Sequence, residues 1–155
     1  GTLTKPSTGN DWVAKVPASF KEATITVQAR IDGTTRRMGT ETFRIKQLPN
    51  PIASIANRTD GFIDKEIIIN ERIITPKMPD EFDFEYPYKI ESFKLSMQRG
   101  FNNYQYESTS DELTPEMIKQ IIKTNRGQVL VFDNIIAVGP ENNRRSVAPL
   151  IFTIN

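Results

Sequence analysis

Two prolines separated by one residue divide this sequence into two parts. They lie at the end of the run from Phe43 to Pro51, in Leu48-Pro49-Asn50-Pro51. Because each proline lacks a backbone N–H and holds the residue before it extended, a strand of a central sheet cannot continue through this run. We therefore predict that residues 49–52 form a short, stiff strap between two separately packed β units, 1–48 and 53–155.

The composition excludes several classes of function. The chain has 155 residues, of which 37% are hydrophobic and 25% charged, and its net charge of +1 is typical of a folded globular protein. It has no cysteine and no histidine, so thiol nucleophiles, disulfides, the usual zinc sites and the commonest general base are absent. Arg36-Arg37 and Arg144-Arg145 are isolated pairs, which argues against nucleic acid as a partner. We expect no catalytic residue, cofactor or metal.

The ends and the apolar runs of the sequence bear on its location. No apolar run approaches the roughly 20 residues that cross a bilayer, and the first residues do not resemble a signal peptide. The sequence begins at Gly1 without a methionine. We therefore expect it to be a piece of a longer protein.

The first unit has the pattern of a β-hairpin. Apolar and polar residues alternate along Ala23–Ile31, the period of a strand with one buried face. Asp32-Gly33 suits the positive φ of a tight turn, so we expect residues from Thr34 to Met38 or beyond to return antiparallel. The stretch Trp12–Phe20 predicts an edge strand or a cap on the core. About fifty residues bury little surface, so this unit is expected to be half of a sandwich or to lean on its neighbour.

The second unit begins with two apolar runs and one alternating run. Ile67–Ile69 and Ile73-Ile74 are β-branched and predict strands buried on both faces. From Phe82 to Ile90, aromatic and acidic residues alternate, which predicts a strand with one aromatic and one acidic face. The apolar parity changes after Glu91-Ser92, and a β-bulge near Ser92 accounts for the change.

One helix and three strands are predicted in the remainder. Thr114-Pro115-Glu116 combines a capping threonine, a proline suited to the first helical position and an acidic first turn, so we predict a helix over about 114–126 that ends before Gly127. The predicted strands are 129–132, 135–138 and 150–154. The fold class is therefore mainly β, with two β-sandwich or immunoglobulin-like units, the second an antiparallel sheet domain with one α-helix.

Two groups of residues are candidates for a site. Alternation along a strand would place Glu81, Asp83 and Glu85 on one face, as glycosidase carboxylates or calcium ligands, although such a face is more often only solvated. The loop residues from Phe101 to Tyr106 mix aromatic and amide side chains, a mixture that stacks on sugars or anchors protein partners. The same aromatics are also suited to packing within a hairpin, and both interpretations stay open.

Several stretches of the sequence share the pattern of one known family. In Gly39–Ala53, a glycine precedes Phe-Arg-hydrophobic-Lys and a Pro-x-Pro. The other stretches are Phe82–Phe84, Ile90–Phe93, Ile135–Pro140, Arg144-Arg145 and Leu150–Phe152. Together they resemble the C-terminal periplasmic part of the GldM/PorM family, in which the first pattern closes one β-domain and opens the last. Residues 1–48 are then part of the penultimate domain.

The resemblance implies a mechanical role. GldM-like proteins are homodimeric components of the type IX secretion and gliding machinery of Bacteroidetes, anchored in the inner membrane by an N-terminal helix that we expect outside this sequence. Their periplasmic domains reach toward a ring of GldK/PorK and GldN/PorN type at the outer membrane, and link it to the motor formed with GldL/PorL. The chain is then a periplasmic, non-catalytic coupling module.

On this interpretation the last domain docks the ring through a small set of side chains. We predict that these are Phe101, Tyr104, Tyr106, Arg144 and Arg145. The alternative is a carbohydrate-binding or adhesin-like β-module that uses the three aromatic residues. A hydrolase that uses Glu81, Asp83 or Glu85 ranks last.

Overall fold

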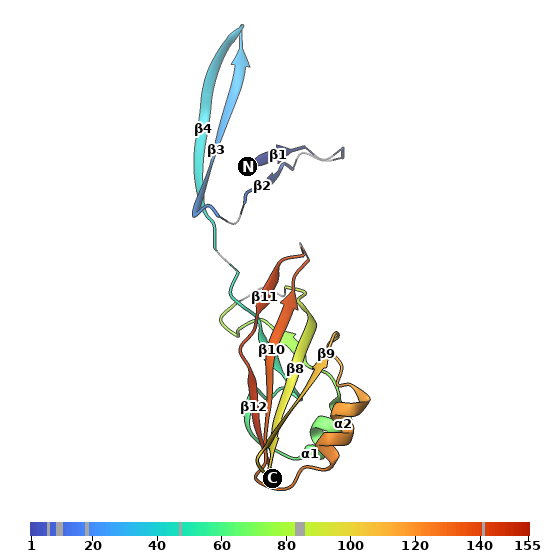
Figure 1. Cartoon of the computed structure of the whole chain (residues 1–155). Coiled ribbons are helices and arrows are strands. Elements are labelled where there is room, and N and C mark those ends of the chain that lie inside the picture. Colours follow the sequence, from blue (N-terminus) through green and yellow to red (C-terminus); the bar gives the residue numbers. More distant parts are fainter. Residues whose placement is uncertain (6, 9–10, 18, 47, 83–85, 141) are drawn as a thin grey trace. The chain divides into compact units, whose positions relative to one another are not determined.

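The computed structural model of the chain describes residues 1–155 except 6, 9–10, 18, 47, 83–85 and 141 (Figure 1). The described residues form two compact units, Gly1–Leu48 (unit 1) and Pro49–Asn155 (unit 2). Most of the regular structure in both units is β-strand, which confirms the prediction of a mainly β chain. The boundary between the units falls at the first proline of the strap.

Unit 1 contains two antiparallel hairpins. β1 (Thr2–Thr4) pairs with β2 (Val13–Lys15), and β3 (Glu22–Ile31) pairs with β4 (Thr34–Arg44). The turn between β3 and β4 is Asp32-Gly33, and both of its residues have positive φ. The predicted hairpin therefore exists, and its second strand extends as far as Arg44.

The β3–β4 hairpin has a polar face and an apolar face. On the polar face, cross-strand threonines pair, and the hydroxyl oxygens of Thr24 and Thr42 lie 3.2 Å apart. Alternate residues of β3 form the apolar face, but none of the described residues of unit 1 is buried. The large apolar side chains of this unit that stay exposed are Leu3, Trp12, Val13, Phe20, Val27, Ile31, Met38 and Phe43. Within its described residues, unit 1 has no core of its own.

A six-stranded sheet forms one layer of unit 2. Its strands are, in spatial order, β6 (Asp60–Ile63), β12 (Leu150–Ile154), β10 (Val129–Val138), β8 (Lys89–Arg99) and β9 (Asn102–Ser108), and β11 (Arg144–Ser146) pairs with one end of β10. β6 runs parallel to β12, and the other pairs are antiparallel. The predicted strands at 129–132, 135–138 and 150–154 are confirmed, the first two as parts of the single strand β10.

The second layer of unit 2 covers one face of this sheet. It consists of α1 (Lys65–Glu71), α2 (Pro115–Ile122) and a small sheet of β5 (Ile52–Ser54) with β7 (Thr75–Lys77). Apolar side chains fill the space between the layers, and among the fully buried ones are Ile55, Ile68, Ile74, Phe93, Leu95, Met117, Ile121, Leu130, Phe132 and Phe152. The core of the protein therefore lies in unit 2, between a sheet and a mixed layer.

Helix α1 occupies a segment whose sequence predicts a strand. Ile67–Ile69 were predicted as a buried strand, but they lie in α1, and only Ile68 is fully buried. A short apolar run does not by itself distinguish a strand from a buried helix. Packing against α2 outweighs the low helix propensity of isoleucine, and Lys65 Nζ donates hydrogen bonds to the carbonyls of Ile122 and Thr124 at the end of α2.

The bulge predicted near Ser92 is present, with Glu91 as the extra residue of β8, and β10 has a second bulge opposite it. The pairing of β8 with β10 shifts on both sides of the pair Ile136–Ser92. As a result, the buried positions change from even to odd numbers along both strands. On β8 the change falls between Ile90 and Phe93, and on β10 it falls between Phe132 and Ile135. The two bulges compensate, so both strands keep an apolar face toward the core.

The helix predicted at Thr114 is confirmed, and the strand predicted from Phe82 is not. The hydroxyl of Thr114 accepts a hydrogen bond of 3.2 Å from the backbone N–H of Met117, and α2 ends at Ile122. Residues 83–85 of the alternating run lie outside the described residues, and residues 86–88 form no strand, so that β8 begins only at Lys89.

Candidate docking site

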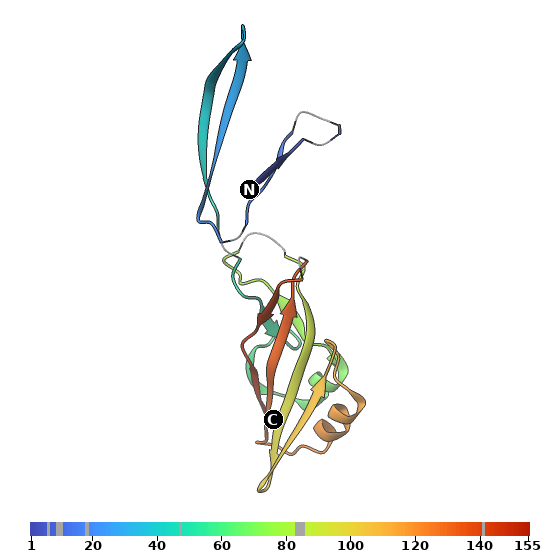
Figure 2. The same ribbon diagram turned by 45° about the horizontal axis from the view of Figure 1, so that its top comes forward.

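The hairpin between β8 and β9 ends in a two-residue loop. β8 ends at Arg99 and β9 begins at Asn102, so Gly100 and Phe101 form the connection, which we call the hairpin tip. Gly100 has a φ of +60°, a conformation that glycine adopts without strain and that suits the first position of such a loop. In unit 2 this hairpin runs beyond the ends of the other strands (Figure 2). The backbone therefore holds the tip in a defined place at one end of the sheet.

Phe101 is the most exposed large apolar residue of the described chain. Its exposed fraction is 105%, so no other part of the described chain shields the ring. A phenylalanine that packed within its own hairpin would be mostly covered. Of the two interpretations that the sequence left open for this residue, packing is therefore not what the structure shows.

The two tyrosines of β9 lie on the core side of the sheet edge. Tyr104 faces Met97 across the strand pair and is 37% exposed, and the guanidinium carbon of Arg99 lies 5.9 Å from the centre of its ring. Tyr106 faces Leu95 and packs partly buried against the core. Tyr104 thus borders the hairpin tip, whereas Tyr106 contributes mainly to packing.

An open hollow lies next to the tip. It has a volume of about 280 Å³. Its lining residues are Ser96, Met97, Gln98, Asn103, Tyr104, Gln105, Val129 and Val131. Amide and hydroxyl groups from β8 and β9 form one side of the hollow, and apolar side chains of β10 form the other, so the surface beside the tip offers both kinds of contact.

The two arginines lie at the other end of the sheet. Arg144 and Arg145 pair with Val138 and Ala137, whereas the strands leading to the tip meet β10 near Leu130. About seven residues of β10 separate the two places, which corresponds to roughly 23 Å at the usual rise of a strand. The structure therefore does not bring the five predicted docking residues together on one surface.

Arg144 forms an exposed ion pair with the bulge of β8. Its Nη2 and Nε atoms donate hydrogen bonds of 2.6 and 2.8 Å to the two carboxylate oxygens of Glu91. The hydrogen bond and the positive charge of Arg144 lower the pKa of Glu91, and the same contact raises the pKa of Arg144. Both groups are solvated, so we expect a small contribution to stability.

Arg145 bonds to the strap instead. Its side chain is partly buried, and its Nη1 atom donates a hydrogen bond of 3.0 Å to the side-chain oxygen of Asn50. Nothing in the sequence pointed to this contact, because 95 residues separate its two partners.

The predicted acidic group gains no support. Glu81 lies exposed in a turn, and Asp83 and Glu85 are outside the described residues. In the part of the chain that the structure describes, no three acidic side chains lie close enough to hold a metal ion.

Comparison with protein families decides the class of the chain. The model of the family described as the GldM C-terminal domain matches residues 49–155, which is unit 2 from its first residue to its last. The chain belongs to the GldM C-terminal domain family. A search of the curated proteins found no match.

Membership in the GldM family makes the chain a component of the gliding and type IX secretion machinery. The GldM C-terminal domain is a periplasmic part of a membrane-anchored protein. Among the described residues, no helix is long and apolar enough to cross a membrane.

Proposed function

We propose that the chain is a non-catalytic coupling module that transmits energy from the inner-membrane motor to a ring associated with the outer membrane. The observation that carries this proposal is the match of unit 2 to the GldM C-terminal domain. The motor partner is of GldL/PorL type and acts through the N-terminal part of the complete protein. The ring partners are of GldK/PorK and GldN/PorN type, and they are bound by unit 2.

The hairpin tip is the proposed centre of the ring contact. Its exposed Phe101 offers a large apolar side chain at the end of two strands that are paired up to Arg99 and Asn102, and this pairing limits the backbone entropy that is lost when a partner covers the ring. Aromatic residues of this kind dominate the energy of many interfaces. Tyr104 and the polar rim of the neighbouring hollow extend the contact. Docking through Arg144 and Arg145 remains a prediction. A partner that binds them contacts a surface separate from the hairpin tip.

A second copy of the chain is proposed to complete unit 1. The apolar face of the β3–β4 hairpin is uncovered, and an isolated two-stranded ribbon is at best marginally stable in water. A homodimer that covers this face removes Val27 and Phe43 from water. Replacing Val27 with aspartate should therefore increase the monomer fraction in analytical ultracentrifugation, whereas Thr26→Asp on the polar face should not. Equal sedimentation of the two variants would count against this part of the proposal.

Capture of ring proteins tests the proposed function. The complete protein and a version that lacks residues 52–155 are compared as baits in cells that carry the type IX machinery. We expect the ring proteins to be retained only by the intact bait, since the docking surface lies in unit 2. If the shortened bait retained them equally well, the proposal would fail.

The hollow beside the tip favours one alternative. The hollow combines amide and apolar side chains, and the exposed ring of Phe101 lies at the adjacent tip, so a carbohydrate-binding or adhesin-like module that uses Phe101, Tyr104 and Tyr106 is the second candidate. A glycan array separates the two functions. Sugar binding that is lost in Tyr104→Ala would support the alternative, and no binding to any glycan would leave protein docking as the function.

A further inference from the structure

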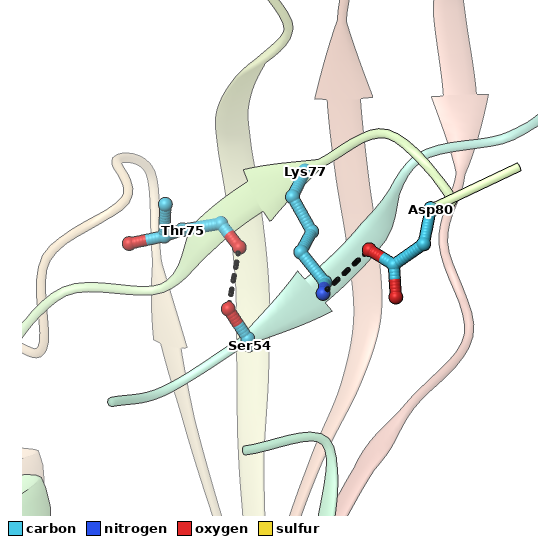
Figure 3. Close-up of polar contacts among 4 residues, drawn as sticks. All are labelled: Ser54, Thr75, Lys77 and Asp80. Atoms are coloured by element: carbon cyan, nitrogen blue, oxygen red, sulfur yellow. Dashed lines mark hydrogen bonds and ion pairs between the residues drawn. The ribbon is translucent and has the colours of Figure 1, made fainter. Parts of the chain in front are cut away.

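The strap is anchored in unit 2 on its C-terminal side. Pro51 is buried, and Ile52 begins strand β5, which pairs with β7 through Ile52–Lys77 and Ser54–Thr75. Figure 3 shows two polar contacts of this small sheet: Ser54 Oγ donates a hydrogen bond of 3.3 Å to the carbonyl of Thr75, and Lys77 pairs with Asp80 at 3.4 Å. From Pro51 onward, the course of the chain is therefore fixed by packing and by β pairing.

Asn50 is the residue of the strap at which the backbone torsion angles are least restricted. The rings of Pro49 and Pro51 fix their own φ angles, and a residue that precedes proline is restricted to extended ψ values. The ψ angle of Pro49 and the φ angle of Asn50 are the torsions between the two rings that neither ring restrains directly. A contact on its side chain is therefore well placed to decide the direction in which the chain leaves unit 2.

β11, which is paired with β10 of the main sheet, provides that contact. Three register pairs hold β11 against the end of β10, and because side chains alternate along a strand, Arg144 and Arg145 leave it on opposite faces. Arg144 reaches Glu91 on β8, and Arg145 reaches Asn50 on the strap. One short strand thus ties the strap to the main sheet.

We infer that Arg145 is a positioning residue, whose hydrogen bond to Asn50 sets the direction of the strap. A planar guanidinium on a partly buried stem is well suited to this task, since it always carries its charge and donates in fixed directions. The mechanical meaning of this inference rests on the proposed coupling function. Its structural content concerns unit 2 alone.

Amide hydrogen exchange of the whole chain tests the inference. Peptides that cover residues 48–54 are followed by mass spectrometry in Arg145→Ala, in Asn50→Ala and in the double variant. We expect each single variant to exchange about threefold to tenfold faster in these peptides, the effect of losing one partly solvated hydrogen bond. We expect the double variant to be no faster than either single one. Exchange in β9 should not change.

Two further variants distinguish positioning from general loosening. Arg144→Ala removes the same charge from the neighbouring residue but leaves Asn50 bonded, so exchange in 48–54 should stay as in the unmodified chain. Asn50→Asp turns the contact into an ion pair and should slow exchange, and this gain should disappear when Arg145 is also replaced by alanine.

Several results would overturn the inference. They are unchanged exchange in Arg145→Ala, equal acceleration in Arg144→Ala and Arg145→Ala, or additive effects in the double variant. If Arg145→Ala does not fold, Asn50→Ala tests the inference instead, because it removes the acceptor of the same hydrogen bond at an exposed position. If Arg145→Ala loosens the strap but secretion continues, Arg145 is still the positioning residue. That result would count against the proposed coupling function.

Discussion

Units 1 and 2 are both built from β-strands, but only unit 2 contains a core. Every buried apolar side chain in the described chain belongs to unit 2, where a sheet and a mixed layer face each other. Unit 1 offers two hairpins, each with a face that its described residues do not cover. Alternation of apolar and polar residues therefore specifies a strand, whereas a stable domain also needs a second layer.

The largest effect is expected when the two units are produced separately. Residues 49–155 should unfold in one cooperative transition, because their core is complete. Residues 1–48 should show no cooperative transition at low concentration, since they have nothing to bury their apolar face against. Circular dichroism during urea titration measures both. A cooperative transition of the 1–48 peptide as a monomer would show that unit 1 has a core of its own.

A matched pair of glycines should give a smaller difference. In unit 2, a Cβ at Gly139 would lie 2.9 Å from Cε1 of Tyr86 and 3.3 Å from Cε1 of Tyr88, so Gly139→Ala should cost about 1–3 kcal/mol of stability through overpacking. In unit 1, a Cβ at Gly39 would meet no atom within 4 Å, so Gly39→Ala should stay within about 0.5 kcal/mol. Urea unfolding of the whole chain checks both values, and equal costs would contradict the difference in packing.

The smallest expected effect concerns pH. Arg144 lowers the pKa of Glu91 in the folded chain, so this pair stabilises the fold above the glutamate pKa of the unfolded chain. The stabilisation is lost as the pH falls through the lower pKa of the folded state. In unit 2, Glu91→Gln should therefore reduce the acid-side slope of the unfolding free energy. Glu41→Gln in unit 1, whose carboxylate is exposed, serves as the control. If the unfolding free energy of the unmodified chain, Glu91→Gln and Glu41→Gln changed with pH in parallel, the ion pair would contribute nothing to stability.

Local signals predicted much of the secondary structure. The turn at Asp32-Gly33, the cap at Thr114 and the change of parity at Ser92 each depend on the backbone preferences of a few neighbouring residues. Ile67–Ile69 were misassigned because their conformation is decided by α2, about fifty residues away.

The candidate site could be predicted only in part. Phe101 was found because a glycine turn and flanking polar residues mark an exposed loop. The separation of Phe101 from Arg144 depends on the pairing of β10 with β8 and β11, which no local pattern specifies. The bond from Arg145 to Asn50 was missed for the same reason.

Two exposed phenylalanines of unit 2 provide the sharpest test of docking through the hairpin tip. Phe101 lies at the hairpin tip, and Phe62 lies on the open face of β6 with an exposed fraction of 68%. Each is replaced by serine in the complete protein, and the amount of ring protein that is captured with it is measured. We predict a loss of at least about tenfold for Phe101→Ser, as for a residue at the centre of an interface, and an unchanged amount for Phe62→Ser. Undiminished capture by Phe101→Ser would contradict the account.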